Sequence, residues 1–64
     1  MKLYAYNTDT MEVLAVINGE SNTECERKAK EAGLGAGDET GWTYSPAFET
    51  VDGLVDTDDA EEIE

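Results

Sequence analysis

Two segments near the start of the chain have the hydrophobic patterns of β-strands. Polar and apolar positions alternate over residues 2–6, with Tyr4 and Tyr6 on the same face, and this period of two with aromatic side chains is typical of a strand. Residues 12–18 are apolar on both faces, which favours a central strand. The Asn-Thr-Asp-Thr sequence at residues 7–10 favours a turn, so the two strands are predicted to form an antiparallel hairpin.

A helix is predicted over residues 22–32. Ser21 and Glu24 have the spacing of a capping box, in which Ser21 accepts from the backbone N–H of Glu24 and Glu24 reaches back to the N–H of Ser21. Gly33 suits the left-handed position that ends a helix. The apolar stripe is narrow and consists of Cys25, Ala29 and Ala32. The remaining face has opposite charges at i,i+4 in three pairs: Glu24–Lys28, Glu26–Lys30 and Arg27–Glu31.

The second half has weaker patterns. A glycine-rich loop over residues 34–41 precedes a short predicted strand at residues 42–44. Pro46 cannot donate to a sheet and marks an edge, a bulge or a break. Residues 48–51 are predicted to be extended, and the Asp-Gly pair at residues 52–53 indicates a hairpin turn between residues 50–51 and 54–55.

Residues 56–64 leave three alternatives open: a short acidic strand, a frayed terminus, or a single helical turn capped by the Asp58-x-x-Glu61 spacing. The elements together predict an α+β fold in ββαββ order, with an antiparallel sheet of three to four strands and one helix on one face. Residues 1–64 are expected to form a single domain with a possible flexible acidic tail at 56–64. The sheet face that carries Tyr4 and Tyr6, and the order of the strands, stay open.

Charge is distributed very unevenly along the chain. The net charge is −12, of which the first 32 residues contribute −2 and the last 32 contribute −10. The second half holds ten acids and no base. A small domain ordinarily carries a net charge of about 2 to 8 units, and a chain of this length buries only about 60% of its unfolded surface. Self-repulsion therefore opposes folding in a domain whose stability is already marginal.

No catalytic or metal-binding pattern is found. The chain has no histidine and one cysteine, which excludes an internal disulfide and zinc-finger spacings. We interpret Cys25 as a core residue on the apolar stripe of the helix. An EF-hand starting at Asp56 would need a ligand and a glycine where Ala60 and Glu61 stand, and the glycines at residues 33–37 have no lysine to hold a phosphate. We expect no enzymatic activity, no metal and no cofactor.

The sign of the charge also restricts partners. Phosphate backbones and anionic membranes would both repel this surface, and the sequence has neither a charged-then-apolar leader nor an apolar run of membrane-spanning length. A carboxylate-rich surface can instead occupy the Lys/Arg groove with which another protein binds nucleic acid. The residues expected to contact such a basic partner are the acids Asp38, Glu39, Glu49, Asp52, Asp56, Asp58, Asp59, Glu61 and Glu62, with Tyr44 as an aromatic anchor.

The alternative hypothesis belongs to a different class. The chain would be a small protein-interaction module that binds through an aromatic sheet face or a sheet edge, while its acidity provides solubility. Its binding would then depend on aromatic side chains such as Tyr6 or Tyr44 more than on any carboxylate.

In length, acidity, single-domain α+β pattern and lack of catalytic residues, the chain resembles small phage-encoded anti-CRISPR proteins of the DNA-mimic kind. The resemblance covers the whole chain in character and includes no family motif, so no functional residue is transferred from it. It implies an inhibitor in the host-cell cytoplasm, with a type I CRISPR effector complex as a possible partner.

Overall fold

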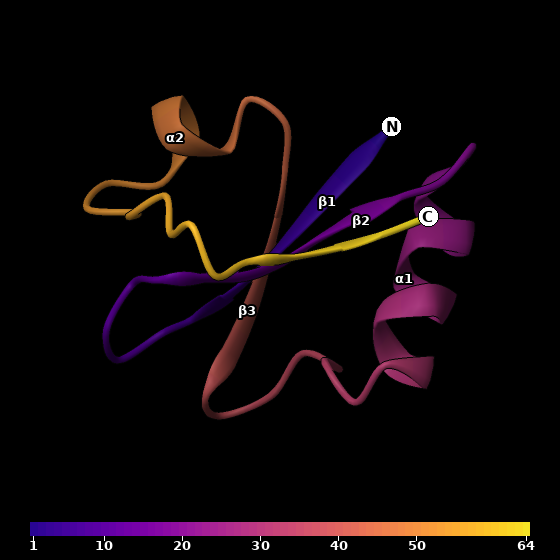
Figure 1. Cartoon of the computed structure of the whole chain (residues 1–64), viewed down its shortest axis with the longest axis horizontal. Helices are drawn as coiled ribbons and strands as arrows, with labels where there is room; N and C mark the ends of the chain where they lie inside the picture. The colour runs from indigo at the N-terminus through magenta and orange to yellow at the C-terminus, as the bar shows by residue number, and fades with distance from the viewer.

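The computed structural model describes residues 1–64, and its elements are β1 (Lys2–Asn7), β2 (Val13–Asn18), α1 (Asn22–Glu31), β3 (Thr40–Tyr44), α2 (Ala47–Thr50) and β4 (Glu61–Ile63). The strands form one sheet in the order β3-β1-β2-β4 (Figure 1). β1 is antiparallel to β2 and to β3, whereas β4 is parallel to β2. The predicted α+β class is confirmed. The prediction of a purely antiparallel sheet with a single helix is wrong, because the sheet is mixed and a second, short helix is present.

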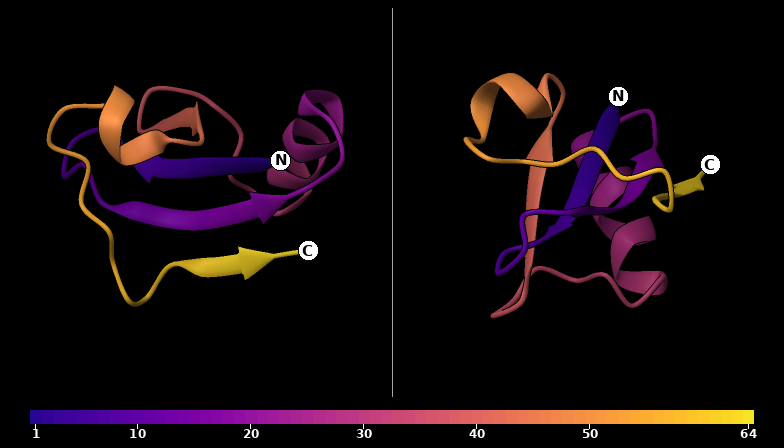
Figure 2. Two further views of the ribbon diagram at one scale, coloured as in Figure 1. Left: turned by 90° about the horizontal axis from the view of Figure 1, so that it is seen from above. Right: turned by 60° about the vertical axis from the view of Figure 1, so that its left-hand side comes forward.

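The connection from β3 to β4 explains the mixed sheet. These strands lie at opposite edges, and the chain between them crosses the side of the sheet that α1 does not cover (Figure 2). Its helix α2 replaces the extended segment predicted over residues 48–51. The Val51 N–H donates to the Ala47 carbonyl at 3.1 Å, and the Thr50 hydroxyl donates to the carbonyls of Pro46 and Ala47. These short-range bonds close a helical turn where β-propensity alone favoured a strand.

The predicted hairpin around Asp52 and Gly53 is also wrong. A turn does form, and Gly53 has the positive φ of 81° that such a turn favours. However, the flanking residues do not pair with each other. Val55 instead forms a parallel bridge with Glu12 beside the start of β2. The segment around Val55 therefore pairs with the first hairpin and not with residues 50–51.

The first hairpin has the predicted form. The Asn7 side-chain carbonyl accepts from the N–H groups of Asp9 at 2.8 Å and Thr10 at 3.2 Å, which holds the turn. β2 has a neighbour on each side and is the central strand that its two apolar faces predicted. The pairing register shifts between Ala5 and Tyr6, so one residue of β2 near Leu14 is unmatched in the ladder.

Helix α1 begins at Asn22, as the sequence predicted, and ends at Glu31, one residue before the predicted end; its N-terminal cap also differs in one bond. The Ser21 hydroxyl accepts from the Glu24 N–H at 3.2 Å, and Gly33 adopts a positive φ of 78° after the helix. The Glu24 carboxylate, however, accepts from the N–H of Glu20 at 2.8 Å, whereas the capping-box pattern assigned it to the N–H of Ser21. It thus bonds one residue further upstream, where the chain leaves β2.

The core lies between α1 and the two middle strands. Its six buried members are Leu3, Ala5, Ala15, Ile17, Cys25 and Ala29. The core position of Cys25 is therefore confirmed, while Ala32 is exposed and does not continue the predicted stripe. The small side chains of Cys25 and Ala29, which face the sheet, let α1 approach closely. Trp42 packs against this core and donates its indole N–H to the Leu34 carbonyl at 2.8 Å, which fixes the loop after α1.

Candidate protein-binding surface

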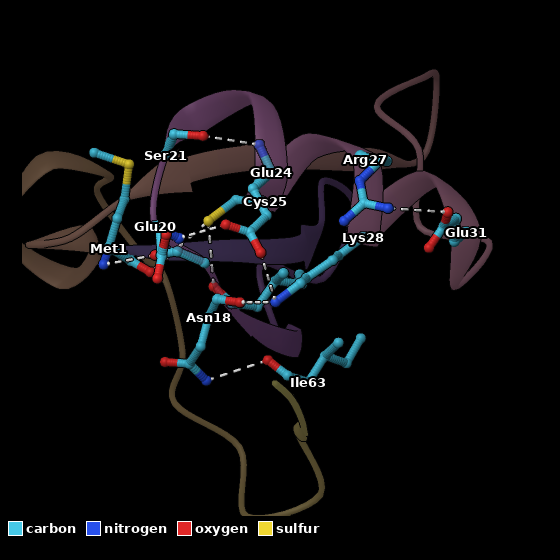
Figure 3. A network of polar contacts seen from close by, with 12 residues as sticks. Met1, Asn18, Glu20, Ser21, Glu24, Cys25, Arg27, Lys28, Glu31 and Ile63 are labelled. Carbon is cyan, nitrogen blue, oxygen red and sulfur yellow. Dashed lines mark hydrogen bonds and ion pairs between the residues drawn. The ribbon is translucent and has the colours of Figure 1, made fainter.

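Two of the three positive charges of α1, those of Arg27 and Lys28, are paired with acids of the same helix. Lys28 lies 3.5 Å from the Glu24 carboxylate and donates to the Asn18 carbonyl at 2.8 Å (Figure 3). Arg27 lies 3.7 Å from Glu31, and both side chains are largely exposed. The predicted Glu26–Lys30 pair does not form. No acid between residues 33 and 64 takes part in an ion pair, so the charge of −10 in the second half has no cation in contact.

Part of this charge gathers where β1 turns into β2. The Thr8 N–H donates to the Glu39 carbonyl at 3.0 Å, and the Thr8 hydroxyl donates to the Asp38 carbonyl at 3.2 Å. These bonds place the exposed residues Asp38 and Glu39 against the turn that contains Asp9. Two acids of the predicted partner surface are thereby joined by one from the first half of the chain.

A second segment reaches the same end of the sheet. The Val55 N–H donates to the Met11 carbonyl at 2.7 Å, and the Val13 N–H donates to the Val55 carbonyl at 3.0 Å. The Thr57 hydroxyl also donates to the Val13 carbonyl. Asp56 is consequently held beside Glu12, and both residues are exposed.

We call this end of the molecule the turn-end acidic surface, formed by Asp9, Glu12, Asp38, Glu39 and Asp56. Sequence reasoning missed Asp9 and Glu12, because they lie in the nearly neutral half of the chain. The predicted hairpin turn placed these two acids near each other, but only the pairing of residues 38–39 and 55–57 with the hairpin shows that they belong to the same surface.

The other predicted contact acids do not join this surface. Glu49 is on α2 and Asp52 is in the turn that follows it. Asp58 and Asp59 lie in the turn before β4, closed by the bond from the Ala60 N–H to the Thr57 carbonyl at 3.2 Å. Glu61 and Glu62 lie in β4 beside β2, at the edge of the sheet opposite β3. These six acids therefore occupy three further places on the molecule and do not form a single cluster with the turn-end acidic surface.

The acidic end of the chain is attached to the sheet. Three residues of β4 pair with β2, and the Asn18 side-chain amide donates to the Ile63 carbonyl at 3.2 Å (Figure 3). Of the three alternatives for residues 56–64, the short acidic strand is the one present, over residues 61–63. Ile63 also packs against the core, which gives this strand an apolar anchor.

Tyr44 lies away from the turn-end acidic surface. It pairs with Leu3, four residues along β3 from Thr40 and hence about 13 Å from the turn end. Its hydroxyl donates to Glu26 Oε2 at 3.0 Å and contacts the Asn22 carbonyl at 3.5 Å, so it joins β3 to α1. Desolvation, followed by the hydrogen bond to and charge of Glu26, raises the pKa of Tyr44 to about 12. Any contact with a partner would thus use an already engaged hydroxyl.

Hydrogen bonding at the start of α1 changes the pKa of Glu24. The pKa of Glu24 is lowered, chiefly by the hydrogen bond from the Glu20 N–H, with smaller lowering by Lys28 and Arg27 and an opposing effect of desolvation. On the same side of the molecule, the N-terminal ammonium of Met1 donates to the Gly19 carbonyl at 3.0 Å (Figure 3). Glu24 is therefore part of the helix cap rather than a free acid for partner binding.

The face of the sheet opposite α1 carries aromatic residues. The rings of Tyr4 and Phe48 meet edge to face, with centroids 5.6 Å apart and planes at 79°, so α2 packs on this face. Tyr6 lies across Gly41, where an added Cβ would come within 2.6 Å of its ring. Three large apolar side chains remain exposed in this half of the structure: Leu14 at 37%, Phe48 at 44% and Val55 at 48%.

Comparison of the chain with protein-family models, with curated proteins and with solved structures finds no match. The structure contains no pocket, and no group of three or more cysteine or carboxylate side chains is arranged to hold a metal ion. Neither helix combines the length and the hydrophobicity needed to cross a bilayer.

Proposed function

We propose that this protein is a non-enzymatic inhibitor whose acidic surface mimics nucleic acid and occupies the basic nucleic-acid-binding groove of a partner protein. A type I CRISPR effector complex is the first partner to test. The turn-end acidic surface is the part proposed to enter the groove. The observation that carries the proposal is that the ten acids of the second half have no cation in contact with them.

The magnitude of the charge supports this choice. The molecule is 26 Å along its longest axis and carries −12. Duplex DNA has one negative charge per about 1.7 Å of axis, so a segment of that length would carry about 15 charges. A partner's groove that binds duplex DNA would therefore meet nearly the same total charge over the same length when it binds this protein.

Charge at this density acts on the rate and on the salt dependence of binding. A field of one sign steers a cationic partner and raises the association rate, and the effect falls with ionic strength. The Debye length is about 10 Å at 0.1 M salt, which is shorter than the molecule, so added salt should weaken the attraction strongly.

The test is competition with target DNA for a purified type I effector complex, followed across a salt series. Asp38→Lys with Glu39→Lys reverses two charges on the turn-end acidic surface. The matched control is Glu20→Lys with Glu31→Lys, which makes the same change in net charge at exposed positions elsewhere. Glu24 is unsuitable as a control because its carboxylate caps α1. Glu26 is unsuitable because its carboxylate accepts a hydrogen bond from the Tyr44 hydroxyl.

We expect the wild type to displace DNA at low salt, and its affinity for the complex to fall at least tenfold between about 50 and 300 mM salt. The Asp38/Glu39 variant should lose far more affinity than the control variant. Equal losses would mean that only net charge matters and would refute the assignment of this surface. Absence of binding would remove the effector complex as partner, and the same series with other basic nucleic-acid-binding proteins would then decide the general proposal.

A second function is favoured by the exposed apolar residues opposite α1. Three apolar side chains on this face are each more than a third exposed: Leu14, Phe48 and Val55. The Phe48 ring also packs edge to face against Tyr4. In an interaction module that uses this face, Phe48→Ala would weaken binding more than the Asp38/Glu39 reversal, and binding would persist at high salt. The same salt series and variant set separate the two functions.

A further inference from the structure

The two edges of the sheet are protected very differently. β4 is only three residues long and carries Glu61 and Glu62, and short acidic edges resist pairing with other chains. β3 has five residues, Thr-Gly-Trp-Thr-Tyr, with no charge and no proline. Its register with β1 is continuous, so no bulge disrupts it. The strand β3 itself therefore has no charge, proline or bulge to block its edge.

The hydrogen bonds flanking β3 identify which of its backbone groups face outward. The Ser45 N–H donates to the Lys2 carbonyl, and the Thr8 N–H donates to the Glu39 carbonyl. In an antiparallel pair, bonded and non-bonded positions alternate. The even-numbered residues of β3 therefore turn their N–H and C=O groups away from β1.

One of these outward residues is already engaged within the chain. The Gly37 N–H donates to the Thr40 carbonyl at 3.0 Å, so the loop after α1 already occupies the outward carbonyl of Thr40, the first residue of β3. Trp42 and Tyr44 remain, each with an outward N–H and C=O. Their side chains pack toward α1, which keeps the backbone between them extended and in place. This edge is a preformed template for one more short strand.

We propose that the outer edge of β3 binds an extended segment of a basic partner protein as an added strand, through the backbone groups of Trp42 and Tyr44. The basic character of the partner rests on the function proposed above. Asp38 and Glu39 stand just before the strand and are exposed, so lysine or arginine flanking the incoming segment would meet opposite charge. A second copy of this chain would bring another −12 to the same place and is disfavoured by repulsion.

The probe is a 12-residue peptide with a Thr-Val-Thr-Val-Thr core and lysines at both ends. The control peptide has the same core with glutamates in place of the lysines. Binding to the 15N-labelled full-length protein is followed by amide chemical shifts and by hydrogen exchange. We expect the lysine peptide to shift and protect the amides of Trp42 and Tyr44, and the glutamate peptide to bind at least tenfold more weakly.

Chemical synthesis provides a backbone test that leaves every side chain in place. The 64-residue chain can be assembled by ligation at Cys25, with an N-methyl group on the Trp42 amide to block its outward donor. The matched control is N-methylation of Asp58, whose amide lies inside the turn closed by Ala60 and Thr57. We expect the Trp42 modification to weaken peptide binding at least tenfold and the Asp58 modification to leave it unchanged, with both proteins folded by circular dichroism.

Three results would overturn the proposal: equal binding of the two peptides, perturbations centred on β4, or a dimer of the unmodified protein that protects the same two amides. The two proposals also fail separately. An effector complex that binds the Trp42-methylated protein as well as the wild type counts against the added strand alone. Peptide binding at β3 without any competition against DNA counts against nucleic-acid mimicry alone.

Discussion

Replacing Gly19 with alanine is a direct test of how closely the chain passes α1 after β2. A Cβ at this position would lie 2.8 Å from Cys25 Sγ and 3.2 Å from the Cys25 backbone nitrogen. Favourable non-bonded contacts between carbon atoms are about 3.5–4.0 Å, so the added methyl is too close to the sulfur by roughly 0.7 Å and to the nitrogen by roughly 0.3 Å. Cys25 is fully buried with its sulfur near the carbonyls of Met1 and Ile17, which prevents it from withdrawing.

Two opposing effects decide the size of the change. Overpacking a core costs about 1–3 kcal/mol, whereas alanine reduces the entropy of the unfolded chain and stabilises by about 0.4–1 kcal/mol. The expected net loss for Gly19→Ala is about 1–2 kcal/mol. At about 4–8 °C per kcal/mol for a domain of this size, the melting temperature should fall by about 4–16 °C.

The assay is thermal and urea unfolding followed by circular dichroism and Trp42 fluorescence, extended to a double-mutant cycle. Cys25→Ala removes the sulfur that the new methyl would meet, so Gly19→Ala should cost less in that background, with a coupling of about 1 kcal/mol. A Gly19→Ala protein as stable as the wild type, or strictly additive changes in the cycle, would refute the close contact between residue 19 and α1.

The remaining predictions concern the core and two titrating groups. Ile17→Ala should destabilise by about 2–5 kcal/mol, a large part of the roughly 3–10 kcal/mol expected for 64 residues, while Leu14→Ala at an exposed position should cost well under half as much in urea unfolding. Because the folded-state pKa of Glu24 is lowered, its stabilisation is complete above the ordinary glutamate pKa of 4.5, which holds in the unfolded chain, and is lost as pH falls through the folded-state pKa. Glu24→Gln should therefore be less stable than the wild type at pH 6, and the difference in stability should close in acid. The folded-state pKa of Tyr44 is raised to about 12, so the stability it contributes is complete below pH 10 and is lost as pH rises from 10 toward 12. Alkaline unfolding of Tyr44→Phe should lack that decline, and an unchanged pH profile would contradict the desolvation of this hydroxyl and its contact with Glu26.

Local sequence features were sufficient where the stabilising contacts are local. The Asn7 turn, the Ser21 cap and the left-handed Gly33 each depend on bonds or angles within a few residues, and each appears as predicted. The same reasoning failed where a local preference met a competing partner. The Glu26 carboxylate accepts from Tyr44 rather than pairing with Lys30, because β3 brings a phenol to the helix that no i,i+4 rule can anticipate.

The sequence by itself determined the first hairpin, the main helix, the uneven charge and the α+β class, since periodicity, capping residues and charge counts are properties of neighbouring positions. Only the tertiary structure decided that β4 runs parallel to β2, that α2 crosses the opposite face, and that Asp9 and Glu12 share a surface with Asp38, Glu39 and Asp56. These arrangements join segments up to 45 residues apart, as in the bond from Asn18 to Ile63. Their partners are selected by how the whole chain packs, because a strand edge or a carboxylate carries no local signal of which distant segment will reach it.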